Sequence, residues 1–157
     1  MDNEPNVFRR VTQEDLKGQF KSQLPDHFFM DSSTTAASAF GREQQAFGIA
    51  LGNTLVSACV YRKFSDSILI DGIISFANVS ILKRFVKEFE VPPGVFLLDD
   101  LVLKGATKFE YRVIYGKGKR MVNRLKKYNL LLHSPTRQSV EVRSEWLDLA
   151  RRRKRLL

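Results

Sequence analysis

The sequence has few of the residues that build disulfide frameworks and metal sites. Of its 157 residues, one is cysteine, Cys59, and two are histidine. A single cysteine excludes an internal disulfide framework, and one cysteine with two histidines cannot make a zinc site by themselves. Cys59 lies in a strand-like apolar run, where we expect a buried, unreactive thiol. We therefore expect no metal centre.

Long apolar runs and targeting segments are also missing. No run reaches the roughly 18 apolar residues that a membrane-spanning helix needs. The opening MDNEPNVFRR lacks the apolar core of a secretory signal. We expect no membrane partner and a soluble, intracellular protein in the cytoplasm, with nucleoid or nuclear association as the alternative.

What is present is the composition of an ordinary globular domain. Hydrophobic residues make up 43% of the chain, and 12 of its aromatic residues are phenylalanine. A chain of this length can bury a proper core as one domain. Enough apolar surface is available to offset the entropy of ordering the chain, so we expect disorder only at the ends.

Periodicity predicts one α+β domain over residues 1–150. Thr12-Gln13-Glu14-Asp15 has the form of a capping box, and apolar residues follow it at helical spacing. Gly52-Asn53 predicts a tight hairpin, and Asn78 predicts the cap of a helix that ends before Pro92-Pro93. Further strands are expected at 68–74, 95–103, 108–115, 130–133 and 140–142, and further helices at 120–128 and from Ser144, with Trp146 facing inward. Together these elements predict a mostly antiparallel mixed sheet flanked by about four helices.

Basic residues are concentrated in the C-terminal third. Nine of the 24 residues between Lys104 and Lys127 are basic, and only Glu110 is acidic. A second run of five basic residues at 151–155 begins the predicted basic tail, 151–157. Because the whole chain carries +9, the remaining residues carry −4. Clustered positive charge repels itself unless a polyanion neutralises it, so the asymmetry predicts a polyanionic partner.

The motif that best fits such a partner is a glycine turn between a predicted strand and a predicted helix, Gly116-Lys117-Gly118-Lys119. Glycines allow successive backbone N–H groups to face one anion, and the helix N-terminus adds partial positive charge. Arg120, Arg124 and Lys127 follow on one helical face. The spacing fits neither a P-loop nor a dinucleotide-binding fingerprint. We interpret the motif as a phosphate-binding surface, with a plain turn before a solvated helix as the alternative.

The main functional hypothesis is a nucleic-acid-binding protein. The Gly-Lys-Gly-Lys turn and the following helix would contact the phosphate backbone largely without sequence specificity. Arg151, Arg152 and Arg153 are candidate additional contacts, although basic chain ends are often only solvated. This hypothesis needs no cofactor and no catalytic residue. The choice between DNA and RNA and the oligomeric state stay open.

Another hypothesis is a Mg²⁺-dependent nuclease. Asp100 near the end of a predicted strand, with Glu110-Tyr111-Arg112 ten residues later, resembles the Asp and Glu-x-Lys pattern of restriction-like nucleases. In that family the acids bind Mg²⁺ and the lysine steadies the attacking water. Arg112 can hold a phosphate but cannot act as a base near neutral pH. A solvated Asp-Asp pair at a strand bend is the alternative.

From end to end the layout also resembles the GNAT-type acyltransferases, in the shortened forms that phages carry. The segment 8–16 is similar to that family's first strand and capped first helix. The hairpin at Gly52-Asn53 and the strand at 68–74 resemble its central strands, and 109–132 resembles its fifth strand and the helix after it. The resemblance implies an acyl-CoA-dependent N-acyltransferase that uses acetyl-CoA, with the Gly-Lys-Gly-Lys turn holding the cofactor's pyrophosphate.

The chain differs from that family at several positions. Leu125 stands where the family has a tyrosine general acid, Asn129-Leu130 stands at its Gly-Phe, and Gly118 stands where asparagine is common. No Gln/Arg-x-x-Gly-x-Gly loop follows the 68–74 strand. These differences favour a nucleic-acid backbone over a cofactor as the phosphate that the turn binds.

Overall fold

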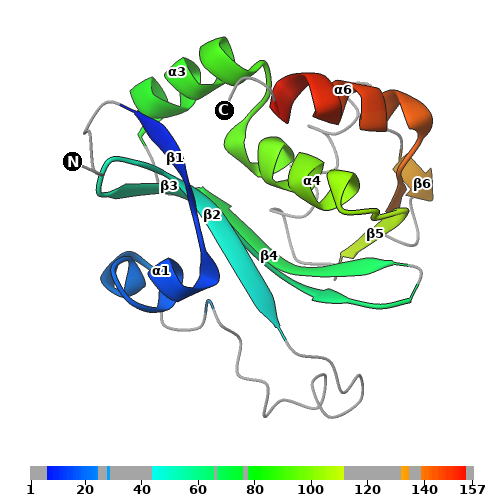
Figure 1. The fold of residues 1–157 in the computed structure, drawn as a ribbon, viewed down its shortest axis with the longest axis horizontal. Helices are drawn as coiled ribbons and strands as arrows, with labels where there is room; N and C mark the ends of the chain where they lie inside the picture. Colours follow the sequence, from blue (N-terminus) through cyan, green and yellow to red (C-terminus); the bar gives the residue numbers. More distant parts are fainter. Residues whose placement is uncertain are drawn as a thin grey trace.

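A seven-stranded sheet in the order β1-β2-β3-β4-β5-β7-β6 runs through the molecule (Figure 1). The computed structural model describes residues 7–24, 28, 44–65, 67–75, 78–111, 132–134 and 139–154. The strands are β1 Phe8–Val11, β2 Gln45–Leu51, β3 Thr54–Lys63, β4 Ile68–Ser75, β5 Lys108–Tyr111, β6 Leu132–Ser134 and β7 Ser139–Glu141. The helices in the described residues are α1 Gln13–Lys17, the short 3-10 helix η1 Lys21–Gln23, α3 Val79–Phe89, α4 Pro93–Leu103 and α6 Ser144–Lys154. The predicted α+β class, with a mixed, mostly antiparallel sheet and about four helices, is confirmed.

The first four strands form the antiparallel meander that the sequence predicts. The β2–β3 hairpin turns at Gly52-Asn53, and η1 is attached to that turn. The Gln23 amide nitrogen donates to the Asn53 carbonyl at 2.9 Å, and its amide oxygen accepts from the Leu55 backbone N–H at 2.8 Å. The helical segment that follows β1 is thereby fixed against the hairpin.

The capping box at the start of α1 is also confirmed. The Thr12 hydroxyl accepts from the Asp15 N–H, and the Asp15 carboxylate accepts from the Thr12 N–H. The helix ends at Lys17, earlier than the apolar spacing predicts, and the chain continues through Gly18 into η1. Leu16 and Phe20 are nevertheless fully buried, so the predicted apolar face packs on the sheet.

Residues 95–103 were predicted as a strand, and this was wrong. They belong to α4, which begins with Pro93 at its first turn, a position that suits proline. Nine of the 11 residues of α4 are buried, and a helix that is apolar on all sides is typical of a protein core. A short, uniformly apolar run cannot be assigned to helix or strand by periodicity, which explains the error. No helix in the described residues is long and apolar enough to cross a bilayer.

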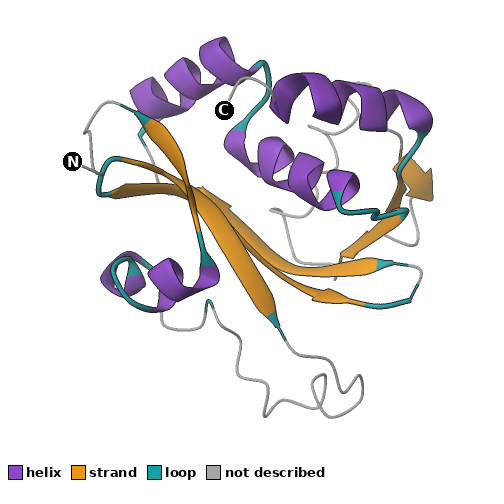
Figure 2. Cartoon of the chain, in the orientation of Figure 1, coloured by secondary structure: helices purple, strands orange, loops and turns teal. Residues whose placement is uncertain are grey.

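The helices cover both faces of the sheet (Figure 2). α1 lies on one face, over a small core that includes Leu16, Phe20, Leu55 and Val60. α3, α4 and α6 lie on the other face, over a larger core rich in aromatic residues. α3 begins at the predicted cap, where the Asn78 side chain accepts from a backbone N–H in the first turn.

α3 and α4 together form the crossover from β4 to β5, which is the one parallel strand pair among the described strands. A parallel pair requires such a long connection, since the chain must return to the same end of the sheet. The carboxyl ends of β4 and β5 therefore lie at the same edge of the sheet.

Candidate functional site

The predicted phosphate-binding motif lies outside the described residues. This holds for Gly116, Lys117, Gly118 and Lys119 and for the basic face Arg120, Arg124 and Lys127. Its position in the sequence is still informative, because it begins five residues after Tyr111, the last described residue of β5. The motif stays a prediction.

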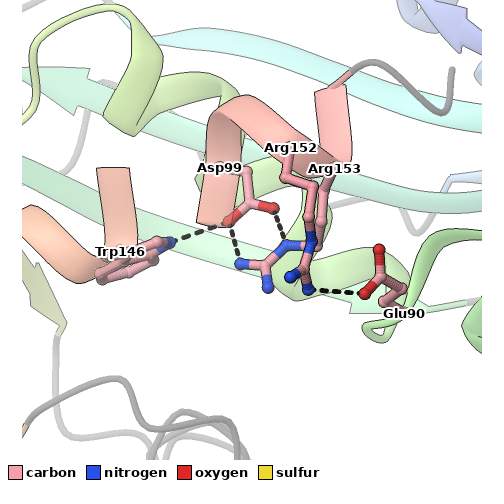
Figure 3. Close-up of polar contacts among 5 residues, drawn as sticks. All are labelled: Glu90, Asp99, Trp146, Arg152 and Arg153. Atoms are coloured by element: carbon pink, nitrogen blue, oxygen red, sulfur yellow. Dashed lines mark hydrogen bonds and ion pairs between the residues drawn. The ribbon is translucent and has the colours of Figure 1, made fainter. Parts of the chain in front are cut away.

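The first four residues of the basic run after residue 150 belong to a helix. Arg151 to Lys154 form the last turn of α6, so the helix continues across the predicted boundary at residue 150. Arg153 is 3% exposed and donates to both carboxylate oxygens of Asp99 on α4, at 2.7 and 2.9 Å (Figure 3). Trp146 Nε1 donates to the same carboxylate at 2.8 Å. Arg153 is therefore a core residue, and its predicted contact with nucleic acid was wrong.

Opposing effects act on the pKa of the Asp99 carboxyl group. Burial raises its pKa, while the hydrogen bonds from Arg153 and Trp146 act to lower it. All the acceptor oxygens and the guanidinium are used within the α4–α6 contact. We interpret this cluster as structural rather than catalytic.

The two other arginines of this turn are exposed. Arg152 forms an ion pair of 2.6 Å with Glu90, the residue that ends α3. Arg151 lies 3.7 Å from Asp148 within α6, in an exposed pair that contributes little to stability. Only these two of the three predicted arginine contacts can reach a partner in solution.

The nuclease hypothesis does not fit the structure. It needs Asp100 on a strand that adjoins the strand of Glu110, but Asp100 lies on α4, where its carboxylate pairs with Arg10. Glu110 lies on β5 and approaches Lys108 at 3.5 Å. Arg112 is outside the described residues. Within the described ranges, no group of three or more His, Cys, Asp or Glu residues could hold a metal ion.

The junction of β4 and β5 is the most distinctive feature of the sheet. The described pairing between them consists of Ile68 with Phe109, Leu69 with Glu110 and Ile70 with Tyr111. β4 then continues for five more residues, to Ser75, with no described strand on its β5 side. The first three residues of β4 are buried, whereas residues 71–74 are only partly buried and Ser75 is exposed.

A buried ion pair lies next to the last described pair of these two strands. Asp71 directly follows Ile70, and its carboxylate accepts from Arg62 Nε on β3 and from the Gln44 amide, both at 2.9 Å. The Arg62 and Asp71 side chains are 2% and 5% exposed. Arg62 Nη1 is buried without a hydrogen-bond partner, so it could still donate to a water or a ligand oxygen.

Sequence reasoning missed the pairing of Arg62 with Asp71, although a signal was present. Each is a charged residue within a run of strand-forming apolar residues, and such charges are buried only when paired. The negative charge of Asp71 also affects Cys59, the thiol that the sequence predicts to be buried and unreactive. Burial, with a further contribution from Asp71, raises the pKa of Cys59 well above its ordinary value, and Cys59 is fully buried.

The sequence matches no protein-family model and no curated protein. Among solved structures it is similar to two mutant forms of a cAMP-binding acyltransferase from Mycobacterium smegmatis. The identities are 13% and 12%, with TM-scores of 0.44 and 0.46. The similarity covers 95% of this chain but only 50% and 51% of those chains, so this chain spans about half their length. Likenesses of this size do not establish a common function.

Proposed function

We propose that the chain is an acyltransferase-like domain that binds an acyl-CoA at the carboxyl ends of β4 and β5. The observation that carries the proposal is the parallel pairing of these two strands, which places their carboxyl ends at the same edge of the sheet, where residues 71–74 of β4 are only partly buried. The N–H and C=O groups along a strand edge can pair with an extended ligand. The pantetheine arm of coenzyme A is extended and contains two amides, so its hydrogen-bonding groups suit such an edge.

The position of this edge also supports the proposal. In sheets with parallel strands, ligands bind at the carboxyl ends of the strands, where neighbouring connections leave in different directions. β4 leads into α3, and β5 leads in sequence toward Gly116-Lys117-Gly118-Lys119. The predicted phosphate-binding turn would then meet the diphosphate of the same ligand whose arm lies along β4.

The residues after β4 do not supply the usual diphosphate grip. The stretch from Ser75 to Ser80, which includes the Asn78 cap of α3, contains no glycine. Close approach of a diphosphate to the backbone favours glycine. The chain therefore fits the pantetheine arm of the cofactor, and the diphosphate depends on the turn at 116–119.

Transfer of the acyl group is a second, separate part of the proposal. The resemblance to GNAT-type enzymes implies an amine acceptor, whose nitrogen attacks the thioester carbonyl and releases the coenzyme A thiol. Leu125 replaces the tyrosine that would protonate that thiol, so we assign no catalytic residue. Thiol release in the presence of candidate amines measures transfer independently of binding.

Thermal unfolding tests the binding step. A ligand at one hundred times its Kd stabilises the folded state by about 2.7 kcal/mol. For a domain of this size that raises Tm by roughly 5–10 °C. We expect acetyl-CoA to produce such a shift, and we expect Lys117→Ala with Lys119→Ala to reduce it. The matched control is Lys83→Ala with Lys87→Ala, two exposed lysines on α3. Absence of any shift at millimolar acetyl-CoA would overturn the proposal.

Nucleic-acid binding is the second candidate, because nine basic residues fall between Lys104 and Lys127. Binding to mixed-sequence DNA or RNA should weaken steeply with salt, with a slope of about 0.9 in log K per phosphate neutralised. Replacing Arg120, Arg124 and Lys127 with alanine should lower affinity equally for every sequence. A salt-independent or absent signal would exclude this candidate and leave the acyl-CoA proposal untouched.

A further inference from the structure

A pocket of about 400 Å³ lies at the opposite end of β4 and β5 from the proposed cofactor edge. It is formed where the β3–β4 turn faces the loop from α4 into β5, two segments that lie close together in Figure 1. Both strands begin here, so the pocket is at their amino ends. Its volume is within the range of small-molecule sites in proteins.

Part of the pocket lining is apolar and aromatic. Tyr61, Phe64, Ile68 and Leu101 contribute to its lining. Tyr61 packs edge-on against Phe47, with ring centroids 5.8 Å apart. The Tyr61 hydroxyl donates to the Gln45 side-chain oxygen at 2.8 Å. Burial raises the pKa of Tyr61, with a smaller contribution from the nearby Cys59. The Tyr61 hydroxyl therefore stays protonated, and the side chain neutral, into the alkaline pH range.

The pocket lining also offers hydrogen-bond donors and positive charge. Lys63 and Lys104 contribute to the lining and are exposed, and neither has a carboxylate partner in the described part of the chain. Lys104 Nζ instead lies 5.6 Å from the centre of the Phe47 ring. The remaining polar lining residues are neutral: Gln45, Ser65, Ser67 and Thr107. Among the described residues, no aspartate or glutamate lines the pocket, and Asp66 is outside those residues.

The end of α4 adds an opposing but smaller charge. A helix C-terminus carries about half a negative charge, on its free carbonyls. Here the carbonyls of Asp100, Leu101 and Val102 accept from the N–H groups of residues 104–106. The segment that follows the helix therefore caps these carbonyls. Among the described lining residues, the two lysines contribute about +2 against a partial charge of about −0.5 at the capped helix end, so this part of the lining favours an anion.

Gly105 forms the bend beside the pocket. Gly105 has φ +102°, a conformation that glycine adopts readily, and it turns the chain from α4 toward β5. A Cβ atom at this position would have no neighbour within 4 Å. The turn therefore brings backbone to the pocket wall without side-chain bulk.

We propose that this pocket binds a small organic anion with an apolar planar body and one phosphate or carboxylate group. The body packs against Tyr61, Ile68 and Leu101, and the anionic group pairs with Lys63 and Lys104. Lysine donates three hydrogen bonds and accepts none, which suits the oxygens of either anion. The ligand does not depend on acyl-CoA binding, because the two sites lie at opposite ends of the strands.

Amide chemical shifts of the ¹⁵N-labelled protein, recorded at low salt, test the proposal. The probes are phenyl phosphate, phenylacetate, phenol as the neutral analogue, and inorganic phosphate as the anion alone. We expect phenyl phosphate or phenylacetate to shift the Ser65, Gly105 and Thr107 amides saturably, and the tighter of the two identifies the anionic group. Either should bind about tenfold more tightly than phenol and inorganic phosphate, as one charge-assisted hydrogen bond allows.

The lysines are tested by substitution. Lys63→Ala with Lys104→Ala should weaken binding of the preferred probe by about tenfold or more, while the control Lys83→Ala with Lys87→Ala leaves it unchanged. All four lysines are exposed, so both double variants should fold, and the spectra report this directly. Phenol binding as tightly as the anionic probes, an unchanged affinity in the first variant, or no saturable shift at these amides would overturn the proposal.

Discussion

Arg153 in the last turn of α6 donates hydrogen bonds to both carboxylate oxygens of Asp99 in α4, and both side chains are almost completely buried. Removing one partner of a buried ion pair leaves an uncompensated charge in the core, which costs about 3–5 kcal/mol. Arg153→Met should therefore lower the free energy of unfolding by that amount in urea titrations. Arg151→Met, at an exposed position in the same helical turn, should change it by less than about 0.5 kcal/mol.

The same pair makes a double variant informative. Asp99→Leu combined with Arg153→Met removes both charges, and an apolar replacement of a buried ion pair is often neutral or stabilising. We expect the double variant to recover part of the stability that Arg153→Met loses, because both buried charges are gone but Trp146 Nε1 loses its acceptor, at a cost of about 1–3 kcal/mol. If Arg153→Met and Arg151→Met unfold at the same urea concentration, the α4–α6 contact is not the structural element described here.

Gly48 on β2 is predicted to tolerate no side chain. A Cβ atom there would lie 2.5 Å from the backbone oxygen of Ser57 on β3, and a backbone atom in a paired strand cannot move aside easily. Gly48→Ala should destabilise the protein by about 1–3 kcal/mol, the usual cost of overpacking.

The control for Gly48 is Gly72 on β4. A Cβ atom there would meet Val60 Cγ1 at 3.6 Å, an ordinary contact. Gly72→Ala should be neutral or stabilising by about 0.5–1 kcal/mol, because alanine loses less entropy on folding. Equal denaturation midpoints for the two alanine variants would contradict the β2–β3 register.

Cys59 should be protected from thiol reagents in the folded protein. The thiolate is the reactive form, and burial with the nearby Asp71 raises the pKa of this thiol, so it stays protonated at pH 8 and beyond. We expect labelling by a chromogenic disulfide at pH 8 to be slow and to accelerate when urea unfolds the chain. A Cys59→Ala/Lys83→Cys variant, with its thiol on the exposed face of α3, should react at once. Rapid labelling of Cys59 without denaturant would contradict its placement in the core.

Local chemistry made much of the fold predictable. The capping box at Thr12, the hairpin at Gly52-Asn53 and the Asn78 cap each depend on residues close in sequence, and all three are confirmed. Trp146 was expected to face inward, and it is 2% exposed. Such features need no knowledge of distant parts of the chain.

The errors arose where distant residues decide the outcome. α4 is apolar on nearly all sides because the sheet and α6 cover it, and the apolar pattern of residues 95–103 alone does not distinguish such a helix from a buried strand. Arg153 was predicted to contact nucleic acid from a basic tail, because its partner Asp99 is 54 residues away in the sequence. The spacing of Trp146, Ala150 and Arg153 does place all three on one helical face, and all three are buried. That spacing was the available signal for the role of α6.

The candidate site was predictable only in part. The resemblance to GNAT-type enzymes and the Gly-Lys-Gly-Lys turn both suggested a phosphate-containing ligand. The edge of the sheet that carries the proposed function could not be deduced, because it depends on the parallel pairing of β4 with β5, two strands that are separated by α3 and α4 in the sequence. The Arg62–Asp71 pair is likewise a product of the β3–β4 register.

Amide chemical shifts during titration with acetyl-CoA test the proposed function most directly. If the pantetheine arm lies along β4, acetyl-CoA and pantetheine alone should both shift the backbone amides of Gly72, Ile73 and Ser75. Adenosine 3′,5′-bisphosphate, which lacks the arm, should leave these amides unchanged. Saturable acetyl-CoA binding that shifts no amide between Asp71 and Ser75, or no binding at all, would contradict the proposal.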